Sequence, residues 1–336
     1  MPPSWVAFFT FACYNNRQTF GEAVAMRGKG WIAALLLLAL MLSGCRPLVA
    51  DAPKRLTVYA TFYPIYALTD AVARGVPDLT LHCLTQPQDG CLRSYALSDW
   101  DISMLASADA VIAGGRGLES FESGLFSMGA KGPAVSAVLY NLELLNTRRN
   151  HGGAEAESHW DGPNPHLYLS VDGAKRIVES IAATLQTLDP GYDQTYIDNA
   201  AVAVERLDAL QSQAREITGD LSGKRVVLMS EALIYVAKDY GLEVAGQFDR
   251  EPGAALYGND LEACLEALKA FDSRVVLIEK QAPATLIRAL EAAGYRVARI
   301  DNLSAHREDE GFEGYIEAQL NNARAVRRAF DGEDGA

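Results

Sequence analysis

Residues 56–73, which read LTVYATFYPIYALTDAVA, decide the fold class of this chain. An apolar, strand-like run comes first, and a helical pattern follows it from Pro64. Strands that alternate with helices are typical of a parallel sheet covered by helices. The alternation recurs in LTLHCL from 79, SDWDISMLAS from 98 and DAVIA from 109, and then in RVVLMS from 225, ALIYVAKDYG from 232, LEVAGQF from 242, RVVLIE from 274, PATLIRALEAAG from 283 and YRVARID from 295. The sequence therefore predicts an α/β protein with two mostly parallel sheets.

A long helical segment separates the two series. From residue 192 to about 218, apolar residues recur every three or four positions, which predicts one continuous helix with a buried face. A helix of that length is a rod of roughly 40 Å, longer than an ordinary connection. The apolar positions are Tyr196, Ala200, Val204, Leu207, Leu210, Ala214 and Ile217. We expect two α/β lobes, at 55–172 and 222–332, joined by linking helices at 173–221.

Composition favours a globular, acidic protein of two domains. The 336 residues are 49% hydrophobic, and the formal net charge is −13. Residues 1–44 contribute a net +2, which leaves −15 on the chain from Cys45 onward. An acidic body of this kind repels nucleic acid and anionic lipid headgroups and tolerates cationic partners.

Residues 26–45, MRGKGWIAALLLLALMLSGC, have the basic start, apolar run and small-residue end of a secretory signal. The LSGC ending is similar to a bacterial lipobox, which implies cleavage before Cys45 and a lipid on its thiol. An ordinary signal or a short anchor helix is the alternative. We expect Met26 to be the true start, 1–44 to be the signal region and 45–54 a tether, so that the protein is extracytoplasmic and anchored to the membrane.

Export exposes the cysteines to an oxidising compartment, where disulfides form. Cys83 and Cys91 flank the turn-forming segment TQPQDG and are a candidate disulfide. Such a bridge would stabilise the fold by roughly 2 to 3 kcal/mol. Cys264, at helical spacing in LEACLEAL, is expected to be a core thiol.

Several stretches together resemble the cluster A-I solute-binding lipoproteins of bacterial zinc and manganese ABC importers. They are the lipobox, TVYATFYPIYALTDAVA, SYALSDWDISMLASADAVIAGGRGLESF, NPHLYL, the long helix, and the run from IEKQAP to RVARIDNL. The resemblance covers most of residues 55–330 in order. It implies two periplasmic-binding-protein-like lobes joined by a rigid helix, with a transported divalent metal, Zn²⁺ or Mn²⁺, in the cleft between them. The implied partners of this expected monomer are permease and ATPase subunits.

The resemblance also implies four metal-ligand positions, of which two match. His166 in NPHLYL stands where the family has its second histidine, and Asp301 stands where the family has an aspartate after the last strand. At the first position Arg93 replaces a histidine. At the third position, where the family has histidine or glutamate, the chain has Ser230, with Glu231 directly after it.

In one interpretation the protein still binds the metal. His166, Glu231 and Asp301 would hold it, and Glu279 is a possible further carboxylate. One imidazole with carboxylates and open positions suits manganese, iron or weakly held zinc. Arg93 must then point away, because a guanidinium roughly 5 Å from a divalent cation repels it by about 6 to 7 kcal/mol at an effective dielectric constant of 20.

The rival interpretation gives Arg93 the place of the metal. Its guanidinium would pair with Asp301 or Glu231 and close the cleft with a salt bridge. Such a protein would bind another solute, or act as a surface adhesin without metal. An enzyme is not predicted, because G-x-S-x-G, H-E-x-x-H and P-loop motifs are absent from the sequence. His306, in NLSAHREDE, is expected to be exposed.

Overall fold

The computed structural model describes residues 56–87, 92–128, 132–146, 162–248, 256 and 258–332. The chain from Lys54 onward forms one compact unit. Within its described residues lie two four-stranded sheets, and all their strand pairs are parallel. The predicted fold class is therefore confirmed. The signal region, the tether with its lipidation site Cys45, and Cys91 of the candidate disulfide lie outside the described residues.

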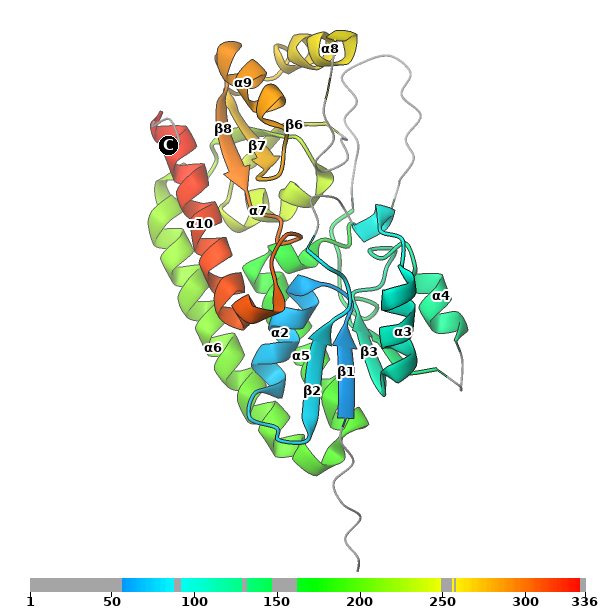
Figure 1. The fold of residues 1–336 in the computed structure, drawn as a ribbon. Coiled ribbons are helices and arrows are strands. Elements are labelled where there is room, and N and C mark those ends of the chain that lie inside the picture. Colours follow the sequence, from blue (N-terminus) through cyan, green and yellow to red (C-terminus); the bar gives the residue numbers. More distant parts are fainter. Residues whose placement is uncertain are drawn as a thin grey trace, which may run out of the picture. The chain divides into compact units, whose positions relative to one another are not determined.

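The N-terminal sheet has the strand order β2-β1-β3-β4, of which Figure 1 labels β2, β1 and β3. Its strands are β1 (Leu56–Ala60), β2 (Leu79–Cys83), β3 (Ala110–Ala113) and β4 (Ala134–Ala137). Because side chains alternate along a strand, Val58 packs on one face and Tyr59 on the other. The first face meets α2 (Tyr63–Ala73) and α5 (Val171–Leu188), and the second meets α3 (Asp99–Ser107) and α4 (Glu122–Ser127).

The C-terminal sheet repeats this plan with the order β6-β5-β7-β8. Its strands are β5 (Arg225–Leu228), β6 (Glu243–Gln247), β7 (Val275–Glu279) and β8 (Arg296–Ile300). One face packs on α8 (Gly258–Leu268) and α9 (Ala284–Ala292), where Cys264 is the predicted core thiol. The other face packs with α7 (Ile234–Asp239) and α10 (Gly311–Asp331).

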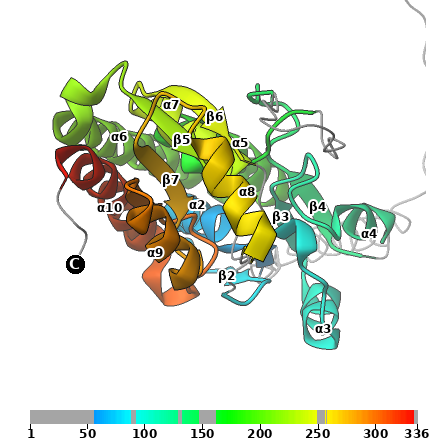
Figure 2. The ribbon, with the colours of Figure 1, turned by 90° about the horizontal axis from the view of Figure 1, so that it is seen from above.

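The predicted long helix is α6 (Asp193–Thr218). It packs against α2 and α5 beside the N-terminal sheet and against α10 beside the C-terminal sheet, as Figures 1 and 2 show. One continuous cluster of buried hydrophobic side chains runs from Val58 through Leu207 of α6 to Ile300. Fully burying a side chain such as Leu207 contributes about 1.5 to 3 kcal/mol. The two sheets are therefore joined by a shared core as well as by the chain.

Local capping explains how α3 and α5 begin. Ser98 and Asp101 form the capping box that the sequence indicates at the start of α3. Ser170 caps α5 by accepting from the Gly173 backbone N–H at 3.1 Å. A Cβ atom on Gly173 would lie 2.3 Å from the carbonyl oxygen of Leu167. The absence of a side chain at Gly173 therefore lets the segment before α5 lie against that helix.

Asp239 ties the end of α7 to the start of α5. Its carboxylate accepts from the Ser170 hydroxyl at 2.7 Å and from the Val171 backbone N–H at 2.6 Å. Burial raises the pKa of the Asp239 carboxyl to about 6, and the two hydrogen bonds only partly offset this. The folded state consequently holds this proton more tightly than the unfolded chain does.

We expect this carboxyl to make the protein more stable as the pH falls from about 6 to about 4, by about 1 to 2 kcal/mol. Stability rises as the pH falls because a carboxyl whose pKa is raised by folding favours the folded state only when it is protonated. Asp239→Asn should remove this part of the pH dependence. Urea unfolding at several pH values measures it, with the 95% exposed Asp272 as the control position for the same change. An unchanged difference between pH 4 and pH 6 in Asp239→Asn would contradict the assignment.

Candidate functional site

The predicted site residues lie at the carboxyl ends of strands or in the loops that follow them. In the C-terminal half, Glu231 begins the short 3₁₀ helix after β5, Glu279 ends β7 and Asp301 follows β8. In the N-terminal half, Arg93 lies in the 3₁₀ helix that follows β2, and His166 caps the 3₁₀ turn before α5. Carboxyl ends of parallel strands meet at one edge of a sheet, where ligand sites of α/β proteins form.

His166 is buried and held in one orientation by its neighbours. Its Nδ1 lies 2.8 Å from the side-chain oxygen of Asn164, whose amide nitrogen donates to the Glu231 carbonyl at 2.8 Å. Since the amide oxygen can only accept, Nδ1 carries the proton, and Nε2 keeps its lone pair. Burial, and then the charge of Arg93, lower the pKa of His166 to about 3. His166 is therefore a neutral imidazole at physiological pH.

An ion pair connects the N-terminal and C-terminal halves beside His166. The Arg93 Nη1 atom contacts the Glu231 Oε1 atom. The side chains are 24% and 10% exposed, so this pair is well shielded from water. Among the described residues, the second carboxylate oxygen of Glu231 is buried without a hydrogen-bond partner. The structure thus places Arg93 on Glu231, one of the two partners considered for it above, and Arg93 does not point away from the candidate ligands.

Ser230 and Glu279 are buried at the same edge of the C-terminal sheet. The Ser230 hydroxyl accepts from the Ala232 backbone N–H at 3.4 Å and so caps the 3₁₀ helix of Glu231. Glu279 is 1% exposed. The roles of Ser230 and Glu279 as cleft residues stay predictions.

Asp301 is fixed in a tight turn at the end of β8. Its backbone N–H donates to the Asn322 side chain at 2.7 Å, and the Asn322 amide donates back to its carbonyl at 3.0 Å. The Asp301 Oδ1 atom accepts from the Leu303 N–H at 2.9 Å. Leu303 has φ of 67°, which is uncommon for a branched side chain and stores strain of about 1 kcal/mol or more. The turn therefore presents Oδ2 of Asp301 away from the backbone.

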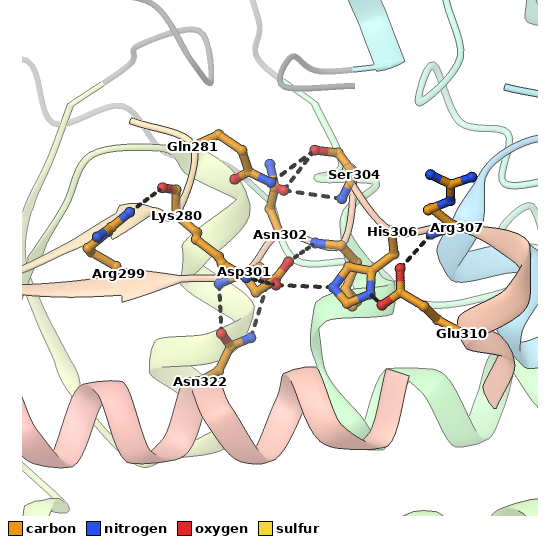
Figure 3. Close-up of polar contacts among 11 residues, drawn as sticks. Lys280, Gln281, Arg299, Asp301, Asn302, Ser304, His306, Arg307, Glu310 and Asn322 are labelled. Atoms are coloured by element: carbon orange, nitrogen blue, oxygen red, sulfur yellow. Dashed lines mark hydrogen bonds and ion pairs between the residues drawn. The ribbon is translucent and has the colours of Figure 1, made fainter. Parts of the chain in front are cut away.

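His306 lies against this carboxylate (Figure 3). Its Nε2 is 3.1 Å from Asp301 Oδ2, and its Nδ1 is 2.7 Å from Glu310 Oε2. Lys280 Nζ also reaches Asp301 Oδ2, at 3.1 Å. The His306 side chain is only 14% exposed, so the expectation of an exposed histidine was wrong. The chain folds back after Leu303 and returns the ring to the carboxylate, which position in the sequence does not reveal.

These contacts shift the pKa values of both Asp301 and His306. Burial alone would raise the pKa of Asp301, but the hydrogen bond and charge of His306, with help from Lys280, lower it to about 2. Burial alone would lower the pKa of His306, yet Asp301 and Glu310 outweigh it and raise the pKa. Both shifts favour the charged forms, the Asp301 carboxylate and the His306 imidazolium.

The structure does not assemble the predicted ligands into one site. In the described residues, no three histidine, cysteine, aspartate or glutamate side chains lie together in a way that could hold a metal ion. His166 lies near Arg93 and Glu231, whereas Asp301 pairs with His306 and Lys280. Sequence reasoning missed His306 as a neighbour of Asp301, and the only available signal was a histidine five residues after it.

Two further observations concern the candidate disulfide and the membrane. Cys83 donates its thiol proton to the Thr85 carbonyl at 3.5 Å, and its proposed partner Cys91 lies outside the described residues. No helix in the described part of the chain is both long and apolar enough to cross a membrane.

Comparison with known proteins identifies related sequences. The zinc-binding lipoprotein AdcA of Streptococcus pneumoniae is 26% identical over 309 residues, which are 89% of this chain and 60% of that protein. The high-affinity zinc uptake system protein ZnuA of Bacillus subtilis is 25% identical over 293 residues, covering 81% and 87% of the two chains. The chain thus spans only about 60% of the length of the AdcA relatives it matches.

Solved structures share the fold. The solute-binding protein FpvC of Pseudomonas aeruginosa in complex with Mn²⁺ matches with a TM-score of 0.71 and 23% identity, over 84% of this chain and 100% of that one. The Zn(II)-bound ZnuA-like domain of S. pneumoniae AdcA matches with a TM-score of 0.67 and 23% identity, over 82% and 99%. At this identity the likeness supports the two-sheet fold with its long helix.

The family profile described as "Zinc-uptake complex component A periplasmic" matches residues 58–329. That segment includes both sheets except the first two residues of β1, all of α6 and all of the candidate site residues from Arg93 to Asp301. The profile describes a component of an uptake complex and not an enzyme. This chain belongs to the family of periplasmic zinc-uptake complex component A proteins.

Proposed function

We propose that this protein is the extracytoplasmic solute-binding component of a metal-type ABC importer. It would capture a divalent cation, Zn²⁺ or Mn²⁺, and deliver it to a permease and ATPase. Membership of the family and the fold shared with metal-bound relatives support the proposal. The observation in this chain that carries it is His166, a buried neutral imidazole whose Nδ1 is fixed by Asn164 and whose Nε2 keeps its lone pair. That arrangement is how proteins orient a metal-ligating histidine.

The proposed ligands are His166, Glu231 and Asp301, with Glu279 as a further carboxylate. Glu231 supports this role because one of its oxygens is buried and lacks a hydrogen-bond partner among the described residues. A cation at Glu231 must displace Arg93 from that carboxylate, since the guanidinium and the ion repel each other. Cation capture in this protein therefore competes with an ion pair between the two halves.

The organisation of the chain follows from the same proposal. We propose an N-terminal lobe at 55–172 and a C-terminal lobe at 222–332, with linking helices at 173–221 between them. The shared core along α6 supports a stiff connection, because bending it would expose buried hydrophobic side chains. Lipid attachment at Cys45 after signal removal and action as a monomer complete the proposal.

A second function is favoured by one contact. The Arg93–Glu231 pair already neutralises a carboxylate that a metal would need. In this alternative the protein has lost tight metal binding and takes another solute, one with an anionic group that Arg93 would contact. The two functions differ in whether the wild-type protein binds a divalent cation.

Titration of the purified, tag-free protein with zinc and with manganese in a calorimeter tests which of the two functions is correct. We expect saturable binding of at least one cation, and at least tenfold weaker binding by His166→Ala, because the variant loses a nitrogen ligand. His82→Ala is the matched control, since the His82 side chain is 40% exposed and lies in edge strand β2. Failure of the wild type to bind either cation below millimolar concentration would favour the second function. Tight binding that survives His166→Ala would show that the site lies elsewhere.

A further inference from the structure

His306 is held as a metal-ligating histidine would be, although it matches none of the family positions that the sequence indicates. The turn at Asp301 and Leu303 returns its ring to the Asp301 carboxylate, with Nε2 facing Oδ2 at 3.1 Å. The ring also stacks on Tyr63, with centroids 4.8 Å apart and planes 20° from parallel. Backbone turn and aromatic stacking together fix where Nε2 points.

The distance between His306 Nε2 and Asp301 Oδ2 is suitable for both atoms to bind one metal ion. Nitrogen and oxygen ligands lie about 2.1 Å from zinc, so donors 3.1 Å apart would subtend an angle of about 95 to 100° at the ion. That value lies between the octahedral and tetrahedral angles, roughly 90° and 109°, which are the geometries of manganese and zinc sites. A cation can therefore replace the Nε2 proton between His306 and Asp301 with little movement of either side chain.

Glu310 supplies the support that a ligating histidine requires. Its Oε2 accepts from His306 Nδ1 at 2.7 Å, and its Oε1 accepts from the Arg307 backbone N–H at 2.8 Å. A carboxylate on Nδ1 fixes the tautomer, orients the ring and makes Nε2 a stronger donor. Asn164 has the corresponding place behind His166, but its neutral amide is the weaker support.

An ion can reach this pair from solvent. His306 lines an open cavity of about 680 Å³ whose wall includes Arg307 as well as the two carboxylates of Glu308 and Asp309. These carboxylates attract cations to the cavity. The other partner of Asp301, Lys280, has a 61% exposed side chain and can move into water when an ion takes its place.

We propose that the Nε2 atom of His306 and the Oδ2 atom of Asp301 together bind the transported divalent cation. This assignment rests on the metal-binding function proposed above. It gives the site one imidazole ligand, where Arg93 and Ser230 stand at positions that the family resemblance implies for metal ligands. No third histidine, cysteine, aspartate or glutamate is grouped with these two in the described residues, so water would supply the other ligands of a cation held by this pair alone.

Titration with zinc chloride and with manganese chloride tests the assignment in the purified protein. We expect His306→Ala to weaken the affinity at least tenfold and Glu310→Gln, which changes only the support of the ring, to weaken it about threefold to tenfold. His82→Ala is the control, because it removes another histidine from the same molecule and leaves this pair intact. Thermal melting of each apo variant shows whether it is folded.

A second measurement uses the wild type alone and so does not depend on the folding of a variant. The chain has five histidines, so ¹⁵N labelling of histidine gives a spectrum simple enough to assign. We expect zinc to move the Nε2 resonance of His306. Wild-type binding that leaves this resonance and the His306→Ala affinity unchanged, but is lost in His166→Ala, would overturn the role of His306 and leave the proposed function standing. A wild type that binds neither cation would overturn both.

Discussion

The double substitution Arg93→His with Ser230→His is expected to tighten zinc binding at least hundredfold. Arg93 now contacts Glu231, and its positive charge lies where it opposes a divalent cation. At roughly 5 Å and an effective dielectric constant of 20 this repulsion is about 6 to 7 kcal/mol, much of which the relaxed side chain can avoid by moving. Two added imidazoles would supply the nitrogen ligands that zinc prefers. Calorimetry in competition with a chelator of known affinity measures the gain.

The single variant Arg93→Ala separates the effect of removing the guanidinium's repulsion from the effect of adding imidazole ligands. It removes the guanidinium without adding a ligand, so any gain that it shows comes from lost repulsion alone. If the double variant binds zinc no more tightly than the wild type, the cation site is not at this edge of the two sheets. If the wild type fails to bind and the double variant binds tightly, the site is an inactivated one, and the second function is correct.

Glu231→Ala is expected to lower the free energy of unfolding by about 2 to 3 kcal/mol, because it leaves the largely buried guanidinium of Arg93 without this carboxylate. The double variant Arg93→Ala with Glu231→Ala should lose less than the sum of the single variants, with a coupling energy of about 1 to 2 kcal/mol. Denaturant unfolding of the four proteins in the cycle measures this. A large loss of stability in Glu231→Ala, together with a loss in the double variant that is smaller than the sum of the two single losses, would establish that the pair joins the two halves.

A second cycle on Arg206 and Glu313 provides the matched control. This pair also links distant parts of the chain, α6 and α10, with contacts of 2.7 and 2.5 Å. Its side chains are 34% and 64% exposed, so its coupling should be only about 0.2 to 1 kcal/mol. Equal couplings in both cycles would mean that burial gives the Arg93–Glu231 pair no special strength, and the pair would then be a weak competitor of a cation.

The two cycles also bear on the proposed transport function. A strong Arg93–Glu231 pair would make apo protein and cation-loaded protein differ in the contact between the halves, since the cation must break that contact at Glu231. Under the proposed function, a permease would distinguish the two forms by this local change. The shared core along α6 makes a large rotation of the sheets unfavourable, so local ordering is the expected signal.

Local patterns in the sequence were sufficient for much of the fold. Ser98 and Asp101 form the expected capping box, because both partners lie within one helical turn. The spacing of apolar residues predicted α6 and most of its buried face, from Tyr196 to Ala214. Ala203 is fully buried where Val204 was expected, and Val204 is only half-buried. Periodicity gives the direction of a face to within about one residue, and the packing partner fixes the rest.

The candidate site depended far more on tertiary structure. The family resemblance selected His166 and Asp301 and showed that Arg93 and Ser230 depart from the pattern, but it left two partners open for Arg93. The choice of Glu231, 138 residues away, depends on how the two sheets pack on α6, and no local pattern contains that information. His306 was expected in solvent, and a strained turn at Leu303 places it on Asp301 instead.

The sequence by itself determined the alternation of strands and helices and the long helix, because these depend on neighbours along the chain. It also supplied the residue types at the four positions that the family resemblance implies for metal ligands. Only the tertiary structure decided which charges meet: Arg93 with Glu231, and His306 with Asp301. The physical reason is that an ionisable side chain leaving water takes whichever partner the packed backbone brings within a few ångströms, and packing joins segments that are remote in sequence.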